Sequence, residues 1–188
     1  MRPPDPRPAR PRRPRPRAAG FATACALAGV LAPAVALPQG ASEYRVKAAF
    51  LYNFALYTEW PDGVGPTINV CLHGGDPFGA DIDALKDKKV GDRRLAVLRN
   101  VPLGALTSCQ VVFVTPAATA ALPRVVERLR DQPALVVADT PGGARAGAAL
   151  NLTIADGRVA FEANVAAAQS AHLKLSSRLL RLAVEVVP

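Results

Sequence analysis

Two cysteines and a histidine are the residues of this sequence best suited to covalent chemistry. Cys71 and His73 are two positions apart in an apolar run, so both side chains would lie on one face of a β-strand and could form a Cys–His pair. Cys109 offers Cys71 a disulfide partner in an oxidising compartment, and a bridged sulfur cannot attack a substrate. We favour the Cys71–Cys109 disulfide, with two separate buried thiols as the alternative, and expect no thiol catalysis.

Two aspartates follow predicted strands, where the ligand-binding loops of α/β folds gather. Asp76 comes directly after Gly74 and Gly75, and the backbone amides of this glycine-containing loop could hold a phosphate or carboxylate. Asp139 begins a loop of turn-forming residues that runs to Gly147. The glycines match neither the dinucleotide fingerprint nor the P-loop. We favour a helix cap for Asp76 and a turn for Asp139. The alternative function is a small-ligand site made by loops Gly74–Phe78 and Asp139–Gly147.

The remaining polar residues give no catalytic set and no metal site. His172 has no second ligand at helical spacing in the predicted final helix, and Ser176 and Ser177 have no base at a suitable spacing. We therefore expect a protein that is not an enzyme and that uses no cofactor or metal.

The first 36 residues have the three parts of a signal peptide. Residues 1–17 contain seven arginines and one acid, residues 18–31 are almost entirely apolar, and Ala34 and Ala36 are the small residues that precede a cleavage site. The apolar run is shorter than the roughly 20 residues of a membrane-spanning helix. We expect removal of residues 1–36 and a single domain, residues 37–188, in the periplasm, with a retained membrane anchor as the alternative.

The leader also accounts for most of the positive charge. The whole chain carries a formal charge of +8, and the seven arginines and one aspartate of the leader contribute +6 of it. The remaining +2 forms no basic stripe with interleaved aromatic residues, so the composition gives no support for nucleic-acid binding.

Apolar runs that alternate with helical patterns predict an α/β fold. Ser42 is a plausible N-cap for a helix that ends before Pro61, and Asp156–Gly157 is typical of a hairpin turn. Because the strands lack polar alternation, we expect a mostly parallel central sheet with helices on both faces, then a C-terminal β-hairpin followed by a helix. The predicted helices are 43–60, 77–86, 122–130 and 165–182, the predicted strands are 68–73, 89–98, 110–115, 134–138, 149–154 and 158–164, and residues 183–187 form an apolar tail.

The first of these helices is apolar on nearly every side. Residues 48–57 contain one polar side chain besides two tyrosines, so this helix must be buried on more than one face, within the domain or against a partner. We expect the partner to contact this helix and the segment 165–187. The predicted partner-binding residues are Tyr44, Phe50, Tyr52, Phe54, Tyr57 and Trp60.

Five ordered segments together resemble the YfiR family: residues 43–54, 58–61, 76–79, 108–114 and 176–183. The resemblance implies an α/β domain in the periplasm that represses a membrane-bound diguanylate cyclase, or another membrane sensor, by holding its periplasmic region. It also implies an outer-membrane lipoprotein that removes the repressor, a bridge between the cysteines that match Cys71 and Cys109, and relief of repression by envelope or redox stress.

The sequence departs from the family in two places. A second cysteine pair that some members carry is missing near residues 139–152, and Leu56 stands where a basic residue is expected. Redox control through that second pair is therefore unsupported. Our leading hypothesis is a non-catalytic periplasmic repressor that lowers cyclic-di-GMP signalling, with a homodimer as one further assembly.

Overall fold

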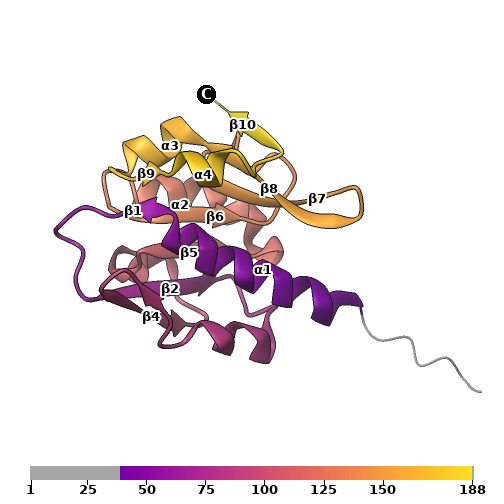
Figure 1. Ribbon diagram of the computed structural model, residues 1–188, viewed down its shortest axis with the longest axis horizontal. Coiled ribbons are helices and arrows are strands. Elements are labelled where there is room, and N and C mark those ends of the chain that lie inside the picture. Colours follow the sequence, from indigo (N-terminus) through magenta and orange to yellow (C-terminus); the bar gives the residue numbers. More distant parts are fainter. Residues whose placement is uncertain (1–38, 188) are drawn as a thin grey trace, which may run out of the picture. The chain divides into compact units, whose positions relative to one another are not determined.

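A central β-sheet crosses the computed structural model, which describes residues 39–187 (Figure 1). The predicted signal peptide, residues 1–36, lies outside this range. Within it the eight-stranded sheet has the order β10-β8-β7-β6-β5-β2-β4-β3. The strands are β2 (Thr67–His73), β3 (Lys89–Val90), β4 (Arg93–Leu98), β5 (Val111–Val114), β6 (Leu135–Ala138), β7 (Leu150–Ala155), β8 (Arg158–Asn164) and β10 (Glu185–Val187).

The middle of the sheet is parallel and buried on both faces. From β4 through β2, β5 and β6 to β7, each strand runs parallel to the next one in the sheet. The two hairpins β3–β4 and β7–β8 are antiparallel. In β5, Val111 and Phe113 belong to one apolar cluster and Val112 and Val114 to the other. Successive side chains of a strand point to opposite faces, so a run without polar alternation is what a doubly covered strand requires.

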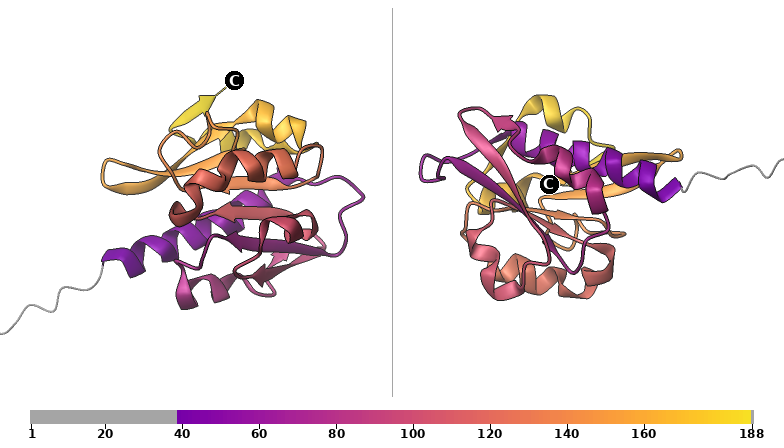
Figure 2. Two further views of the ribbon diagram at one scale, coloured as in Figure 1. Left: turned by 180° about the vertical axis from the view of Figure 1, so that it is seen from behind. Right: turned by 90° about the horizontal axis from the view of Figure 1, so that it is seen from below.

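Helices cover both faces of this sheet, as the sequence predicts (Figure 2). On one face lie α1 (Gln39–Leu56) and the 3₁₀ helix η1 (Gly79–Leu85), which contact each other. On the other lie α2 (Leu122–Arg128) and the 3₁₀ helices η2 (Leu103–Ser108) and η3 (Pro116–Ala121). The predicted fold class, a single α/β domain with a mostly parallel sheet and a C-terminal hairpin followed by a helix, is confirmed.

The first predicted helix has different ends. Helix α1 begins at Gln39, so Ser42 lies inside it, and it ends at Leu56 rather than before Pro61. The Thr58 hydroxyl donates to the carbonyl oxygen of Phe54 over 2.7 Å at this end. Thr58 and Glu59 then form β1 (Thr58–Glu59), which pairs antiparallel with β9 (Lys174–Leu175) in a separate two-stranded sheet.

Three other predicted elements are wrong in detail. The predicted strand 89–98 is the hairpin β3–β4, which turns at Gly91 with a φ of 58°. The predicted helix 77–86 is the shorter η1. The predicted final helix 165–182 is broken into α3 (Val165–Ser170), β9 and α4 (Ser177–Leu180), because His172 takes a φ of 57° between them. The apolar tail forms β10, which pairs in parallel with β8.

Candidate functional site

The loops that follow β2 and β6 meet at one edge of the sheet. Strands β2 and β6 both pair in parallel with β5, so their carboxyl ends flank the end of that strand. The first turns of α1 lie over the same edge: Tyr44 packs edge-on against Phe78, with ring centroids 5.2 Å apart, and Lys47 reaches Asp139. We take this edge, with the exposed side of α1, as the candidate functional site.

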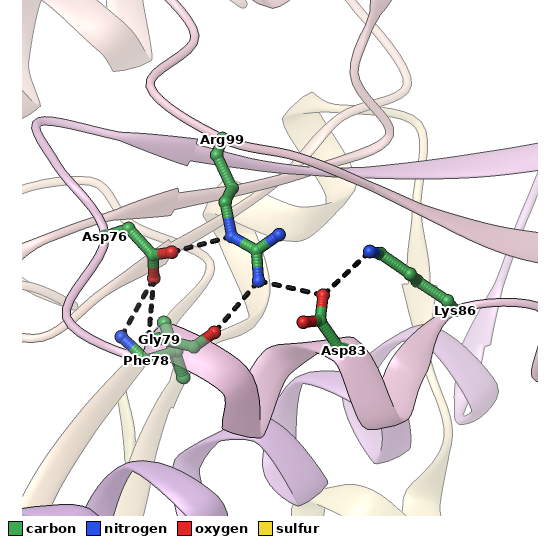
Figure 3. A network of polar contacts seen from close by, with 6 residues as sticks. All are labelled: Asp76, Phe78, Gly79, Asp83, Lys86 and Arg99. Atoms are coloured by element: carbon green, nitrogen blue, oxygen red, sulfur yellow. Dashed lines mark hydrogen bonds and ion pairs between the residues drawn. The ribbon is translucent and has the colours of Figure 1, made fainter.

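Asp76 accepts hydrogen bonds from backbone amides as a cap does, but η1 begins only at Gly79 and its N-cap position is Phe78 rather than Asp76. Its Oδ1 accepts from the amides of Phe78 (2.9 Å) and Gly79 (3.1 Å), and its Oδ2 pairs with the guanidinium of Arg99 at 2.6 Å (Figure 3). Both carboxylate oxygens are therefore engaged by the chain itself, which does not favour Asp76 as a ligand-binding group.

Arg99 holds this loop against η1 and was not identified from the sequence. Besides Asp76, its guanidinium donates to the carbonyl oxygen of Gly79 (2.9 Å) and to Asp83 (2.8 Å), and Asp83 also pairs with Lys86 (Figure 3). Hydrogen bonds from Lys86 and then Arg99 lower the pKa of Asp83, and the two aspartates raise the pKa of Arg99. Arg99 and Asp76 are partly buried, with 30% and 18% of their side chains exposed, and they hold the loop in place, so we assign the network a positioning role.

Gly74 is required by the backbone of the same loop. Its φ is 90°, and a Cβ added there would lie 2.1 Å from the Cβ of Ala118. The hydroxyl of Thr115 donates a hydrogen bond to the carbonyl oxygen of Gly74 over 2.8 Å and so holds the two segments together.

We expect Gly74→Ala to lower the free energy of unfolding by about 2 kcal/mol, because the added methyl group both clashes and strains the backbone. Urea denaturation measures this loss. Gly75→Ala is the matched control: its φ is 116° but no atom lies within 4 Å of the added Cβ, so only the strain remains. Equal losses in the two variants would show that the contact with Ala118 does not matter.

Asp139 was predicted to form a turn, but its side chain also forms an ion pair. Its carboxylate, 10% exposed, pairs at 2.7 Å with the Nζ of Lys47, and that ammonium also contacts Glu43 at 2.6 Å. Lys47 is 4% exposed, so this is a buried cation between two carboxylates. Burial alone lowers the pKa of Lys47, but hydrogen bonds to Asp139 and Glu43 outweigh it, and the pKa lies above its ordinary 10.5. Burial also raises the pKa of Tyr44, against the opposing effect of Lys47.

Two asparagines shape the loop between β6 and β7. Asn151, 1% exposed, accepts from the amide of Thr140 and donates to Glu162, and it leaves no space for a Cβ on Gly143. Asn164 caps α3 and donates to the carbonyl oxygen of Ala144. The loop 139–147 is thus held by the chain. Neither asparagine was predicted as a site residue, since Thr140, Glu162 and Ala144 are 11 to 20 positions away in sequence.

The predicted partner-binding residues, on α1 and just after it, divide into two groups. Phe54 is fully buried, packing against Phe161 at 5.0 Å between ring centroids, so its prediction as a surface contact is corrected: it belongs to the core. The others are partly exposed where they pack against that core: Tyr44, Phe50, Tyr52, Tyr57 and Trp60.

Some of these aromatic residues also have polar partners. Trp60 donates its indole N–H to the carbonyl oxygen of Ala55 over 2.9 Å, and the hydroxyl of Tyr52 donates to the carbonyl oxygen of Lys89 over 3.2 Å. These contacts fix the orientation of the rings on the domain.

The disulfide predicted between Cys71 and Cys109 is present, with a Cα–Cα distance of 5.9 Å. Both sulfurs are buried, in the middle of β2 and just before β5. His73 donates its Nδ1–H to the carbonyl oxygen of Val101 over 2.8 Å, so it is oriented by the backbone and not by a thiolate.

The described residues offer neither a metal-binding group nor a membrane-spanning helix. Among residues 39–187, no group of three His, Cys, Asp or Glu side chains is arranged to hold a metal ion. His172 lies in the turn after α3 rather than in a helix. Within the same range, no helix combines the length and the apolar character needed to cross a membrane.

Comparisons with known proteins give a matching family and similar solved structures. The family model described as YfiR/HmsC-like matches residues 44–184. The structure of a conserved domain protein from Vibrio cholerae O1 biovar El Tor is similar, with 9% sequence identity, a TM-score of 0.47, and coverage of 77% of this chain and 60% of that one. The chain thus spans less than two thirds of that protein, and no curated protein matches. Since the family model covers most of the described domain, the chain belongs to the YfiR/HmsC-like family.

Proposed function

We propose that this chain is an exported, non-enzymatic regulator that binds the periplasmic sensor region of a membrane-bound diguanylate cyclase and so lowers cyclic-di-GMP signalling. The observation that carries the proposal is the family match over residues 44–184, since that family suggests periplasmic regulation of diguanylate cyclases. An outer-membrane lipoprotein that removes the repressor is the second proposed partner, and a homodimer is a further proposed assembly.

Export into the periplasm is supported by the disulfide. Cys71 and Cys109 are bridged, and such bonds persist in oxidising compartments and are rare in the cytosol. The apolar segment of residues 18–31 supports the same route. An exported domain without evident catalytic residues can act on the cell interior through a membrane protein.

An apolar surface on α1 and the C-terminal tail supports partner binding. We call it the α1–tail surface and define it as Val46, Phe50, Leu182, Val184 and Val186. Val46 is 42% exposed, and the three tail residues are 66%, 55% and 47% exposed in that order. Exposed apolar residues that cluster favour protein interaction.

The two parts of this surface meet at β8. The ring of Phe50 lies 5.7 Å from that of Phe161, and the amide of Val184 donates to the carbonyl oxygen of Phe161 over 2.9 Å. One partner segment laid across Phe50 can therefore contact the tail as well. The partner contacts predicted on the first helix and on the C-terminal segment can therefore belong to one continuous surface.

We expect Val46→Asp and Val184→Asp each to weaken binding to the membrane diguanylate cyclase at least about tenfold, because a charge would be desolvated in an apolar contact. Co-purification from membranes, quantified against the wild-type chain, measures this. Leu98→Asp is the matched control, since Leu98 is 39% exposed on β4 and lies outside the surface. If all three variants bind like the wild type, the α1–tail surface is not the docking site.

A further inference from the structure

A cavity between α2 and α3 lies outside the α1–tail surface. Its volume is about 370 Å³, within the usual range of small-molecule sites. Six of its apolar lining residues, which we call the α2–α3 cavity wall, are Val126, Leu129, Ala134, Ala149, Ala167 and Ala171. The cavity reaches the predicted ligand loop 139–147 at Gly147, whereas Asp76 and Asp139 do not line it.

The cavity exists because its wall is built from small side chains. Ala134, Ala149 and Ala171 are buried, yet none of them extends far enough to fill the space between the helices. Gly147, with a φ of 101°, lies close to Val126, since a Cβ there would be 3.2 Å from it. Protein interiors are normally close-packed. The space therefore results from the small size of the alanine side chains, and not from a loop that packs loosely.

The cavity is lined by one cation and one carboxylate. They are Arg130 and Asp131, just after the end of α2, and Arg130 pairs with Glu127, a residue of α2 that does not line the cavity. Among the residues that the structure describes, no cationic side chain pairs with Asp131. With Arg130 paired to Glu127, the carboxylate of Asp131 favours a positively charged group beside it.

We infer that this cavity binds a small organic amine with an apolar body, its ammonium facing Asp131 and its body against the α2–α3 cavity wall. Arg130 stays neutralised by Glu127 and does not repel the amine. Ser170, whose hydroxyl donates to the carbonyl oxygen of Ala166, presents a further acceptor at the rim. The site goes beyond the proposed regulatory function and does not depend on it.

The test is an NMR titration of the purified protein with phenethylamine. We expect saturable shifts of the amides of residues 129–134 and 164–171, in the millimolar range that suits so small a ligand. The matched probe 3-phenylpropionate has the same ring and the opposite charge, and we expect it to bind at least about tenfold more weakly.

Two variants separate the charge from the cavity. Asp131→Asn keeps the positive φ of 59°, which asparagine accommodates, and should weaken phenethylamine binding about two- to fivefold, as for an exposed ion pair. Ala167→Leu should fill the space and reduce binding at least about tenfold, whereas Ala117→Leu, on the exposed η3, should not. No saturable shift in the wild type, equal binding of 3-phenylpropionate, or no effect of Asp131→Asn would each overturn the inference.

Discussion

Loss of the Cys71–Cys109 disulfide is expected to lower the free energy of unfolding by about 4 kcal/mol, the largest effect of any change considered. The bridge closes a loop with a sequence separation of 38, and a cross-link of that span restricts the unfolded chain by about this amount in the loop-entropy model. The double variant Cys71→Ala/Cys109→Ala, compared with the wild type in urea denaturation, measures the loss.

Reductant provides the control for this experiment. Because Cys71 and Cys109 are 0% and 2% exposed, we expect reductant to act on the wild type mainly during unfolding, and to leave the double variant unchanged. A double variant that unfolds within about 1 kcal/mol of the wild type would contradict a stabilising role for the bridge.

Replacing Lys47 by methionine is expected to lower the free energy of unfolding by about 3 kcal/mol. The change keeps an unbranched side chain but leaves the carboxylate of Asp139 buried without its cation, which is the costly half of breaking a buried pair. Thermal or urea unfolding of Lys47→Met measures the effect.

Lys86→Met is the matched control for this variant. Lys86 pairs with Asp83 at 2.8 Å, but the two side chains are 51% and 44% exposed, so we expect a loss of less than about 1 kcal/mol. If Lys47→Met and Lys86→Met are equally mild, the buried pair does not hold α1 to the sheet edge.

The same pair predicts how stability depends on alkaline pH. The pKa of Lys47 is raised in the folded protein, so its stabilising contribution is complete below its ordinary pKa of 10.5 and is lost as the pH rises through the folded value. The pKa of Tyr44 is also raised, so its contribution likewise disappears above about 10.0. Urea midpoints measured between pH 8 and about 11 should therefore fall only at the alkaline end, and less so in Lys47→Met.

The sequence predicts the centre of the sheet well because its signal is local. Strands β5 and β6 are four-residue apolar runs, and continuous burial on both faces leaves no other suitable structure for them. The disulfide and the backbone contacts of Asp76 could also be predicted, because each depends on only a few residues of the sequence. The broken final helix does not, because residues 165–168 favour a helix locally, while burial of Leu173 and Leu175 requires the chain to turn at His172.

The candidate site was harder to predict because its partners are distant in sequence. Lys47 and Asp139 are 92 positions apart, and Arg99 meets Asp76 from 23 positions away, so neither pair has a local pattern. The prediction for α1 rested on its aromatic residues, yet Lys47, a charged residue of the same helix, is the one that reaches Asp139 at the sheet edge. Phe54 was predicted as a surface contact but is buried. A helix that is apolar on nearly every side gives no pattern that tells which ring faces the core.

Intracellular cyclic-di-GMP, measured by mass spectrometry in a strain that lacks this gene, tests the central claim most directly. We expect the level to rise on deletion, to return when the wild-type chain is restored, and to stay high when Val46→Asp is supplied instead. An unchanged level in the deletion strain, grown where its membrane diguanylate cyclases are expressed, would contradict the account.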